Sequence, residues 1–263
     1  PYNSRHKKQK TIRKMKISEI LAKGGQAFPS LEIVPPLKGL TKAELIESIR
    51  PFMEFSPKYI NVTCHRYEYE YRQKADGTYS RHLVRNRISE VAVCGAIMSE
   101  FDVETVPHII CGGASAEEID SELHNLRFMG ISNVMALRGD SIVGEKRFTP
   151  VPGGYRYASE LVAAIRRFDD FFSIGVGGYP EKHFEAPNIE TDIANLKKKV
   201  DAGADYVITQ MFFDNNVYYN FVSRCRAAGI TVPIIPGLKP LSTVRQLTML
   251  PEAFSLDIPF QLS

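Results

Sequence analysis

Residues 189–210 read IETDIANLKKKVDAGADYVITQ, and this stretch contains one full unit of the pattern that decides the fold. In its first part, 189–202, apolar residues recur at the spacing of an amphipathic helix, and Gly203 follows where a glycine favours the end of a helix. Apolar and β-branched residues then form a short run at 206–209, which is typical of a buried strand, and the polar Gln210 ends it. The stretch therefore predicts a helix, a tight turn and an interior strand.

The same alternation of short strands and longer helices runs along most of the chain. Strands are expected at 31–34, 59–63, 106–110, 134–137, 172–176, 206–209 and 232–235. Helices are expected near 42–55, 88–101, 116–129, 158–168, 189–202, 216–228 and 242–250. Because a crossover helix returns the chain in the same direction, this alternation indicates a parallel sheet.

A closed barrel explains the pattern better than an open sheet. The first strand continues as PPLKG, without the G-x-G-x-x-G of a Rossmann sheet, and no Walker A sequence occurs. We therefore expect an α/β protein with the (β/α)8 TIM barrel fold in residues 28–263, preceded by a basic leader and helix in residues 1–27. An eighth strand and helix have no counterpart after Leu250. We expect an omitted C-terminal segment; the alternative is an open seam between the seventh strand and the first.

The composition of the chain limits the classes of protein to which it can belong. The chain has 263 residues, 44% of them hydrophobic, and 33 basic residues against 30 acidic ones, which gives little reason to expect a nucleic-acid partner. Residues 1–16 are strongly basic, and a solvated leader is favoured there over a nucleic-acid arm. No apolar run is long enough for a membrane helix. The four cysteines lack metal-ligand spacing, so we expect no metal, reduced thiols and a cytoplasmic location.

Polar residues stand where the expected strands end. The fourth strand ends in Arg138-Gly-Asp140, the second in Thr63, and the sixth in Gln210. In such barrels the carboxyl ends of the strands form the active site. Glu32 lies inside an apolar strand, where burial raises the pKa of a carboxyl group and suits it to donate a proton. A structural ion pair with a neighbouring Arg or Lys is an equal alternative for Glu32.

Seven blocks of sequence carry a resemblance to a known family. They are, in order, LEIVPPLKG, PHIICGG, ALRGD, YASELV, GYPEKH, NLKKKVDAGADYVITQMFFD and IIPGLKP. Together they resemble the methylenetetrahydrofolate reductase family of flavin enzymes, from Phe28 to about Pro259. The resemblance implies a TIM barrel that holds FAD at the carboxyl ends of the strands. It also implies reduction of 5,10-methylenetetrahydrofolate to 5-methyltetrahydrofolate by NAD(P)H, which supplies methyl groups for methionine synthesis.

The resemblance also implies roles for individual residues. Glu32 matches the general acid that protonates N10 of the folate, and Asp140 matches an aspartate beside the flavin, whose charge favours the cationic iminium form of the substrate. Gln210 and Glu32 match folate-binding positions. The positions that match contacts to FAD are Thr63, His108, Arg138, Gly139, Asp140, Tyr157, Ala158, Tyr179, His183, Asp192, Asn195, Lys198 and Lys199. Of these, Asp192, Asn195 and Lys199 share one face of the helix 189–202, and Lys198 flanks it.

Several further expectations and alternatives accompany this assignment. If NAD(P)H and the folate use the same face of the flavin in turn, ping-pong kinetics are expected. The resemblance also implies a homo-oligomer. The choice between NADH and NADPH stays open. The alternatives are a truncated, non-catalytic flavin-binding barrel and another flavin barrel of the proline dehydrogenase kind. The Tyr-rich segment 65–85 is either a lid over the flavin or a surface hairpin, and the surface hairpin is favoured.

Overall fold

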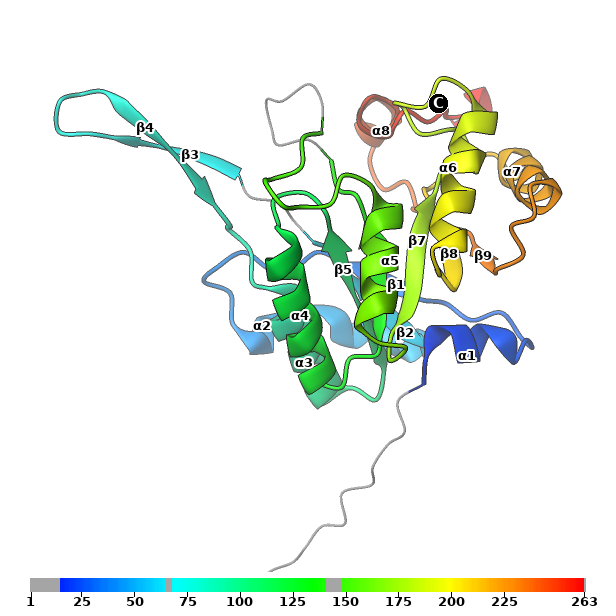
Figure 1. Cartoon of the computed structure of the whole chain (residues 1–263), viewed down its shortest axis with the longest axis horizontal. Coiled ribbons are helices and arrows are strands. Elements are labelled where there is room, and N and C mark those ends of the chain that lie inside the picture. The colour runs from blue at the N-terminus through cyan, green and yellow to red at the C-terminus, as the bar shows by residue number, and fades with distance from the viewer. Residues whose placement is uncertain (1–14, 65–67, 141–147, 263) are drawn as a thin grey trace, which may run out of the picture.

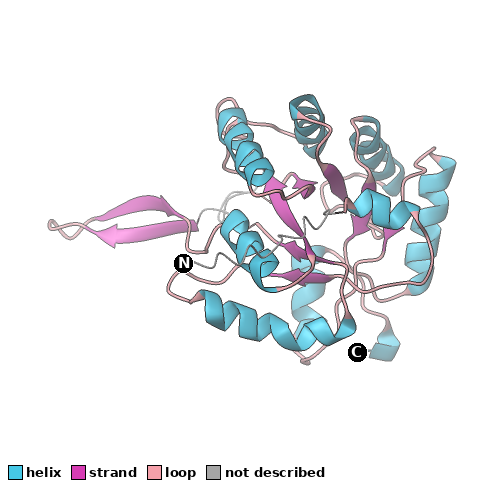
Figure 2. Ribbon diagram, turned by 90° about the horizontal axis from the view of Figure 1, so that it is seen from below, coloured by secondary structure: helices cyan, strands magenta, loops and turns pink. Residues whose placement is uncertain are grey.

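The computed structural model describes residues 15–64, 68–140 and 148–262. Seven parallel strands form one sheet in the order β1-β2-β5-β6-β7-β8-β9, so each strand pairs with the next one of the barrel series. Figures 1 and 2 show this sheet curled at the centre of the molecule with helices around it. The strands are β1 Leu31–Ile33, β2 Tyr59–Val62, β5 Glu104–Ile110, β6 Asn133–Leu137, β7 Ser173–Gly178, β8 Tyr206–Thr209 and β9 Ile234–Ile235. The prediction of a TIM-barrel-like fold that lacks an eighth unit is confirmed.

Helices follow the strands as the sequence predicts, but the bounds of the first and the last helix of the series differ from the predicted ones. They are α2 Lys42–Ile49, α3 Glu90–Glu100, α4 Ala116–Phe128, α5 Ala158–Phe168, α6 Ile189–Asp201, α7 Asn215–Ala227 and α8 Gln246–Phe254, with the short 3-10 helices η1 Arg50–Phe55 and η2 Phe260–Leu262. The first predicted helix changes to η1 at Arg50, because Pro51 has no N–H to continue the α-helical ladder. In the described ranges, no helix has the length and apolarity needed to cross a membrane.

Local sequence fixes where the helices begin and end. Thr41 and Glu44 form a capping box before α2, and Ser115 and Glu118 form another before α4. Gly203 ends α6 with a φ of +117°, a conformation that L-residues rarely adopt. The apolar faces of the helices then pack against the outer face of the sheet and bury the main hydrophobic core.

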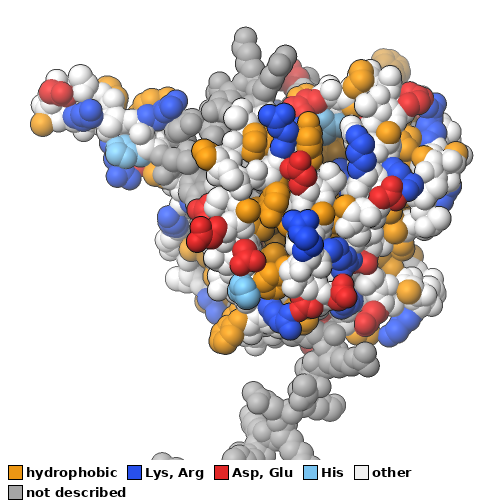
Figure 3. Space-filling view, in the orientation of Figure 1, with side chains coloured by type: hydrophobic (Ala, Val, Ile, Leu, Met, Phe, Trp, Pro, Cys, Tyr) orange, Lys and Arg blue, Asp and Glu red, His pale blue; other side chains and the backbone are white. Residues whose placement is uncertain are grey.

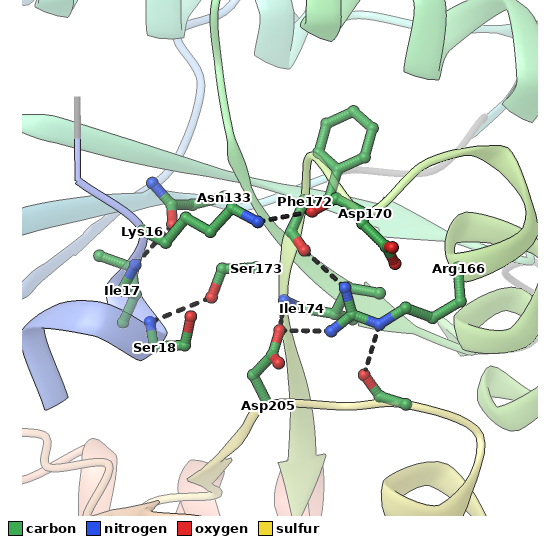
Figure 4. Close-up of polar contacts among 11 residues, drawn as sticks. Lys16, Ile17, Ser18, Asn133, Arg166, Asp170, Phe172, Ser173, Ile174 and Asp205 are labelled. Carbon is green, nitrogen blue, oxygen red and sulfur yellow. Dashed lines mark hydrogen bonds and ion pairs between the residues drawn. The ribbon is translucent and has the colours of Figure 1, made fainter. Parts of the chain in front are cut away.

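The helix α1, Ile17–Ala22, packs against the inner face of the barrel at the amino-terminal end of the strands. Its Ile17 side chain is fully buried in a cluster with inward-facing residues of four strands, Tyr59, Val106, Met135 and Tyr206. The start of α1 is also held by side chains of the sheet, as Figure 4 shows. The Ile17 N–H donates to Asn133 Oδ1 at 2.7 Å, and the Ser18 N–H donates to Ser173 Oγ at 3.1 Å. The helix therefore closes the end of the barrel opposite the predicted site.

A two-stranded antiparallel hairpin is inserted between β2 and α3. It consists of β3 Glu68–Gln73 and β4 Tyr79–Val84. Figure 1 shows this hairpin projecting away from the barrel at one side of the molecule. In this structure it has the form of a surface hairpin, and its strands do not cover the ends of the barrel strands.

Candidate active site

The first part of the site lies on β1, β2 and β5. Glu32 of β1 is the register partner of Asn61 on β2, so both side chains point to the same, inner face of the sheet. His108 of β5 faces the same interior, with its Nε2 atom 3.9 Å from Glu32 Oε2. The His108 side chain is 8% exposed, whereas the Glu32 side chain is 59% exposed toward the open mouth of the barrel. Glu32 is thus accessible to a ligand while a buried imidazole approaches it from within.

The surroundings of Glu32 raise the pKa of its carboxyl group. Partial burial among protein atoms is the larger cause, and the positive charge of Lys239, which follows β9, opposes it. Because more than half of the side-chain surface remains open to solvent, water limits the size of this shift. The direction is the one that a proton donor needs near neutral pH.

A second group of side chains lies beyond β6 and β7. Arg138 Nη1 donates to Glu185 Oε2 at 2.5 Å, and the guanidinium stacks 5.1 Å from the centre of the Phe148 ring. The His183 ring packs edge-on to Tyr179 with the ring centres 4.7 Å apart. Arg138, Tyr179 and His183, three of the predicted FAD-contacting residues, are therefore close together or linked through shared neighbours.

The helix α6 adds an acid and a base to this group. Asp192 is buried and its Oδ2 atom accepts a hydrogen bond from the His183 N–H at 3.1 Å. Lys199 Nζ donates to the Gly177 carbonyl at 2.8 Å, and it lies 5.7 Å from the centre of the Tyr179 ring. Both residues thus face the end of β7.

These charges perturb one another. Burial lowers the pKa of Lys199 to about 8; Asp192 opposes this effect and Arg138 adds to it. Burial also lowers the pKa of His183, and the positive charge of Arg138 works in the same direction. Two cationic groups and an imidazole are therefore held near one another, and burial removes part of the water around each of them. An anion placed among them would stabilise their charged forms.

The ALRGD turn has a tightly defined backbone. The Gly112 N–H donates to the Arg138 carbonyl at 3.0 Å, and Gly139 adopts a φ of +77°. A Cβ atom at Gly139 would lie 3.3 Å from Ile110 Cβ, so both the conformation and the packing favour glycine. Asp140 is exposed at the end of this turn, immediately before residues 141–147, which lie outside the described ranges.

Other predicted residues lie at or near the same end of the sheet. Gln210 follows β8, and its N–H donates to the Gly178 carbonyl at 2.7 Å, while its Oε1 atom accepts from the Met211 N–H at 3.0 Å. Thr63 follows β2, where its N–H donates to the Ile33 carbonyl at 3.0 Å. At the start of α5, Tyr157 is 52% exposed and Ala158 is buried.

Two predicted contacts point elsewhere in this structure. Asn195 and Lys198 are both exposed, and Lys198 Nζ donates to Asn195 Oδ1 at 3.0 Å. The helical period placed Asn195 on the face of Asp192 and Lys199, but only the latter two are turned into the protein. The helix face is therefore divided between a buried part at the strand end and a part in solvent.

Three residues of the site were not predicted from the sequence. Asn61 is 4% exposed and its Oδ1 atom has no hydrogen-bond partner among the described atoms. It could have been found from its place between Tyr59 and Thr63, since alternate residues of a strand share a face. Glu185 and Lys239 lie on loops, and nothing in their local sequence indicates their partners Arg138 and Glu32.

The residues at the strand ends fit a dinucleotide cofactor. Arg138, His183 and Lys199 provide cationic or hydrogen-bonding groups suited to phosphates, and the Asn61 amide oxygen remains available to accept a hydrogen bond. Across the described residues, no cluster of three or more His, Cys, Asp or Glu side chains has the arrangement of a metal site. The cationic members of the set, Arg138 and Lys199, suit an organic anion.

The fold and this site define an α/β barrel protein with a polar binding site at the carboxyl ends of its parallel strands. The sequence comparison specifies the family. The methylenetetrahydrofolate reductase family model matches residues 16–263, and the chain belongs to that family.

Known relatives support the same family assignment. The chain is 34% identical to 5,10-methylenetetrahydrofolate reductase of Escherichia coli, over 89% of this chain and 72% of that protein. It is 35% identical to methylenetetrahydrofolate reductase (NADH) 1 of Arabidopsis thaliana over 94% of this chain, which spans only 41% of that plant protein.

Solved structures support the fold alone. A protein from Clostridium thermocellum that binds two copies of 5-methyl-5,6,7,8-tetrahydrofolic acid aligns with a TM-score of 0.60, at 12% identity, over 93% of this chain and 77% of that one. An oxaloacetate acetylhydrolase aligns with a TM-score of 0.54, at 16% identity, over 92% of this chain and 78% of that one.

Proposed function

We propose that this chain reduces 5,10-methylenetetrahydrofolate to 5-methyltetrahydrofolate, with NAD(P)H as the reductant and FAD as the bound cofactor. The observation that carries the proposal is the position of Glu32, an accessible carboxyl group with a raised pKa at the mouth of the barrel, 3.9 Å from a buried imidazole. Membership of the reductase family supplies the substrate class.

The residues proposed to hold FAD lie on the strands or the segments that follow them, at the start of α5, and on α6. Thr63 and His108 lie on one side, and Arg138, Gly139, Tyr179, His183, Asp192 and Lys199 lie on the other. Asp140, Tyr157, Ala158, Asn195 and Lys198 complete the set proposed from the resemblance. FAD, when bound, supplies hydride chemistry between the nicotinamide and the folate. The protein supplies binding, orientation and the control of one proton.

Glu32 is the residue proposed to deliver that proton. Reduction by NAD(P)H consumes one proton per turnover, and we assign its delivery to N10 of the folate, where protonation opens the five-membered ring. A raised pKa increases the fraction of Glu32 that is protonated before transfer. Lys239 and solvent stabilise the carboxylate afterwards, and Asp140 places a negative charge where the iminium cation forms.

Gln210 is proposed to bind the folate, because it matches a folate-binding position of the family and directly follows β8 at the carboxyl end of the sheet. One face that serves both the nicotinamide and the folate leads to ping-pong kinetics. A cytoplasmic location is proposed as well, since all four cysteines are free thiols.

The decisive experiment separates the two halves of the reaction. The FAD-loaded protein is expected to lose its flavin colour with NAD(P)H and to recover it with methylenetetrahydrofolate. Glu32→Gln keeps the size of the side chain but removes the proton, so the first half should persist while the second is lost. Glu19→Gln, an exposed change on α1, is the matched control. Equal loss of both halves in Glu32→Gln would contradict the assigned role.

The same experiment tests a second function. A flavin-binding barrel without reductase activity would bind FAD and fail to reoxidise with folate in the unmodified chain. Bleaching of the flavin by proline, without reoxidation by methylenetetrahydrofolate, would instead indicate another flavin barrel enzyme of the proline dehydrogenase kind.

A further inference from the structure

Asn61 is a buried polar residue on the inner face of the sheet. Charged side chains are spread over the outside of the molecule, as one face of it shows (Figure 3). Asn61 instead lies inside the barrel on β2, where it is 4% exposed. Its neighbours along the inner face are Tyr59, which belongs to the cluster around Ile17, and Thr63, which follows the strand. The amide therefore lies between the closed end of the barrel and its open mouth.

Only one end of the Asn61 amide has a hydrogen-bond partner. Its Nδ2 atom donates to the Leu31 carbonyl of β1 at 3.5 Å. Its Oδ1 atom is buried and accepts no hydrogen bond from any described atom. A buried carbonyl oxygen without a donor costs free energy. Such an atom beside a candidate active site therefore indicates a donor that appears with a ligand or with a change of protonation.

Glu32 is the side chain that can become this donor. Glu32 and Asn61 are register partners on adjacent strands, so their side chains leave neighbouring points of the same inner face. A protonated carboxyl group has one O–H that can donate, whereas a carboxylate can only accept. The Asn61 amide oxygen can therefore bond to Glu32 in its neutral form alone, and the partial negative charge of that oxygen disfavours the carboxylate.

We propose that Asn61 is a positioning residue for Glu32, whose protonated carboxyl group donates a hydrogen bond to the Asn61 amide oxygen and is held in its neutral form until the proton is transferred. The inference rests on the proposed function, because it concerns the proton that Glu32 delivers to N10 of the folate. When that proton leaves, the hydrogen bond to Asn61 is lost with it, and the amide itself gains no charge.

Other groups around Glu32 favour its charged form. Lys239, which follows β9, lowers the pKa of Glu32, because its positive charge stabilises the carboxylate. His108 of β5 lies 3.9 Å from the carboxyl group and would act in the same direction if it were protonated. On the adjacent strand β2, the facing residue is the uncharged Asn61. The neutral form of Glu32 thus has a partner in Asn61, and the charged form has one in Lys239.

Two substitutions of Asn61 test the proposal, because they should move the pKa of Glu32 in opposite directions. Leucine has nearly the shape of asparagine, so Asn61→Leu should exclude the same water while it removes the acceptor. The pKa of Glu32 should then fall, with a change of about three- to tenfold in its protonation equilibrium. Asn61→Asp keeps the shape and adds a second acid. The pair should titrate in two steps, the higher of which lies above the pKa of Glu32 in the unmodified chain.

Two measurements follow the proton of Glu32. Difference infrared spectroscopy over a range of pH detects the C=O stretching band of a protonated carboxyl group in the folate-free protein, and the band that Glu32→Gln removes belongs to Glu32. Stopped-flow reoxidation of the reduced flavin by methylenetetrahydrofolate gives the pH profile of the second half-reaction. In Asn61→Leu this rate should decline at lower pH than in the unmodified chain, and in Asn61→Asp at higher pH. Circular dichroism and FAD binding check that each variant is folded.

Ser132→Ala is the matched control. It removes another buried polar atom without a partner among the described residues, just before β6 at the opposite end of the barrel, and should leave both pH profiles unchanged. A shift of the Glu32 titration in the same direction in both Asn61 variants, or no shift in either, would overturn the proposal. An unmodified chain that does not reduce methylenetetrahydrofolate would instead contradict the proposed function, and the infrared titration would then decide the role of Asn61.

Discussion

Replacing Lys199 with methionine removes the cation that the structure places between Asp192 and the Gly177 carbonyl. The pKa of Lys199 is about 8 in the ligand-free protein, and a bound diphosphate should raise it toward the ordinary range. If FAD binds the protonated amine, its affinity should fall as pH rises through 8. A single group with this pKa predicts about a tenfold loss of affinity between pH 7 and pH 9.

The stability of the ligand-free protein should change in the opposite direction. The folded-state pKa is lowered from 10.5 to about 8, so the unfolded chain binds more protons between these values and stability rises with pH across that window. The shift corresponds to about 3 kcal/mol. This value is an upper bound, because the Lys199 side chain retains some exposed surface. Lys199→Met should therefore stabilise the ligand-free protein at pH 7 while it weakens FAD binding.

Quenching of flavin fluorescence at pH 7, 8 and 9 measures the affinity, and urea unfolding at the same pH values measures the stability. Lys198→Met is the matched control, because Lys198 is the adjacent residue and is exposed. The control should keep the pH dependence, and Lys199→Met should lose it. An unchanged tenfold loss of FAD affinity in Lys199→Met would refute the assignment of Lys199 to the cofactor.

Two further predictions concern the interior of the barrel. Asn133→Ala removes the acceptor of the Ile17 N–H and should lower the free energy of unfolding by about 1–3 kcal/mol in urea titrations, with release of α1 to limited proteolysis. Ser132→Ala, which removes a buried hydroxyl without a described partner, should have a much smaller effect, and equal effects of the two would contradict this reading of α1. Gly175→Ala would place a Cβ atom 2.5 Å from the Tyr206 ring, so thermal melting should show a loss of about 1–3 kcal/mol or more. Gly177→Ala meets its nearest atom at 3.4 Å and should be tolerated; the reverse order of the two melting temperatures would be inconsistent with the packing described.

The regular part of the fold could be predicted because each strand–helix unit carries its own local signal. The exceptions have local causes too. The last strand is limited to Ile234–Ile235 between Pro233 and Pro236, neither of which can donate to a ladder. The last helix begins at Gln246, whose side chain accepts from the Ser242 and Thr243 N–H groups and holds the preceding residues in a turn.

The residues of the candidate site could be predicted only where an unusual residue type stands at a position that the strand or helix periodicity makes informative. The sequence identified Glu32 because a carboxyl group is unusual inside an apolar strand. It could not show that His108 approaches it, since these residues are 76 positions apart in the chain. The helical period also could not show that Lys199 is turned into the protein while Asn195 is exposed. That difference depends on where the end of the helix lies over the sheet. The roles of the site residues stay predictions.

The docking of α1 has a consequence for the order in which the molecule folds. The contacts of Ile17 and Ser18 are made by their backbone N–H groups to residues that follow them in the chain by 116 and 155 positions. During synthesis on the ribosome, α1 therefore emerges long before the strands that receive it, and the cluster that buries its Ile17 side chain is complete only when Tyr206 of β8 has been made. The amino-terminal end of the barrel is sealed late, by a segment that is translated early.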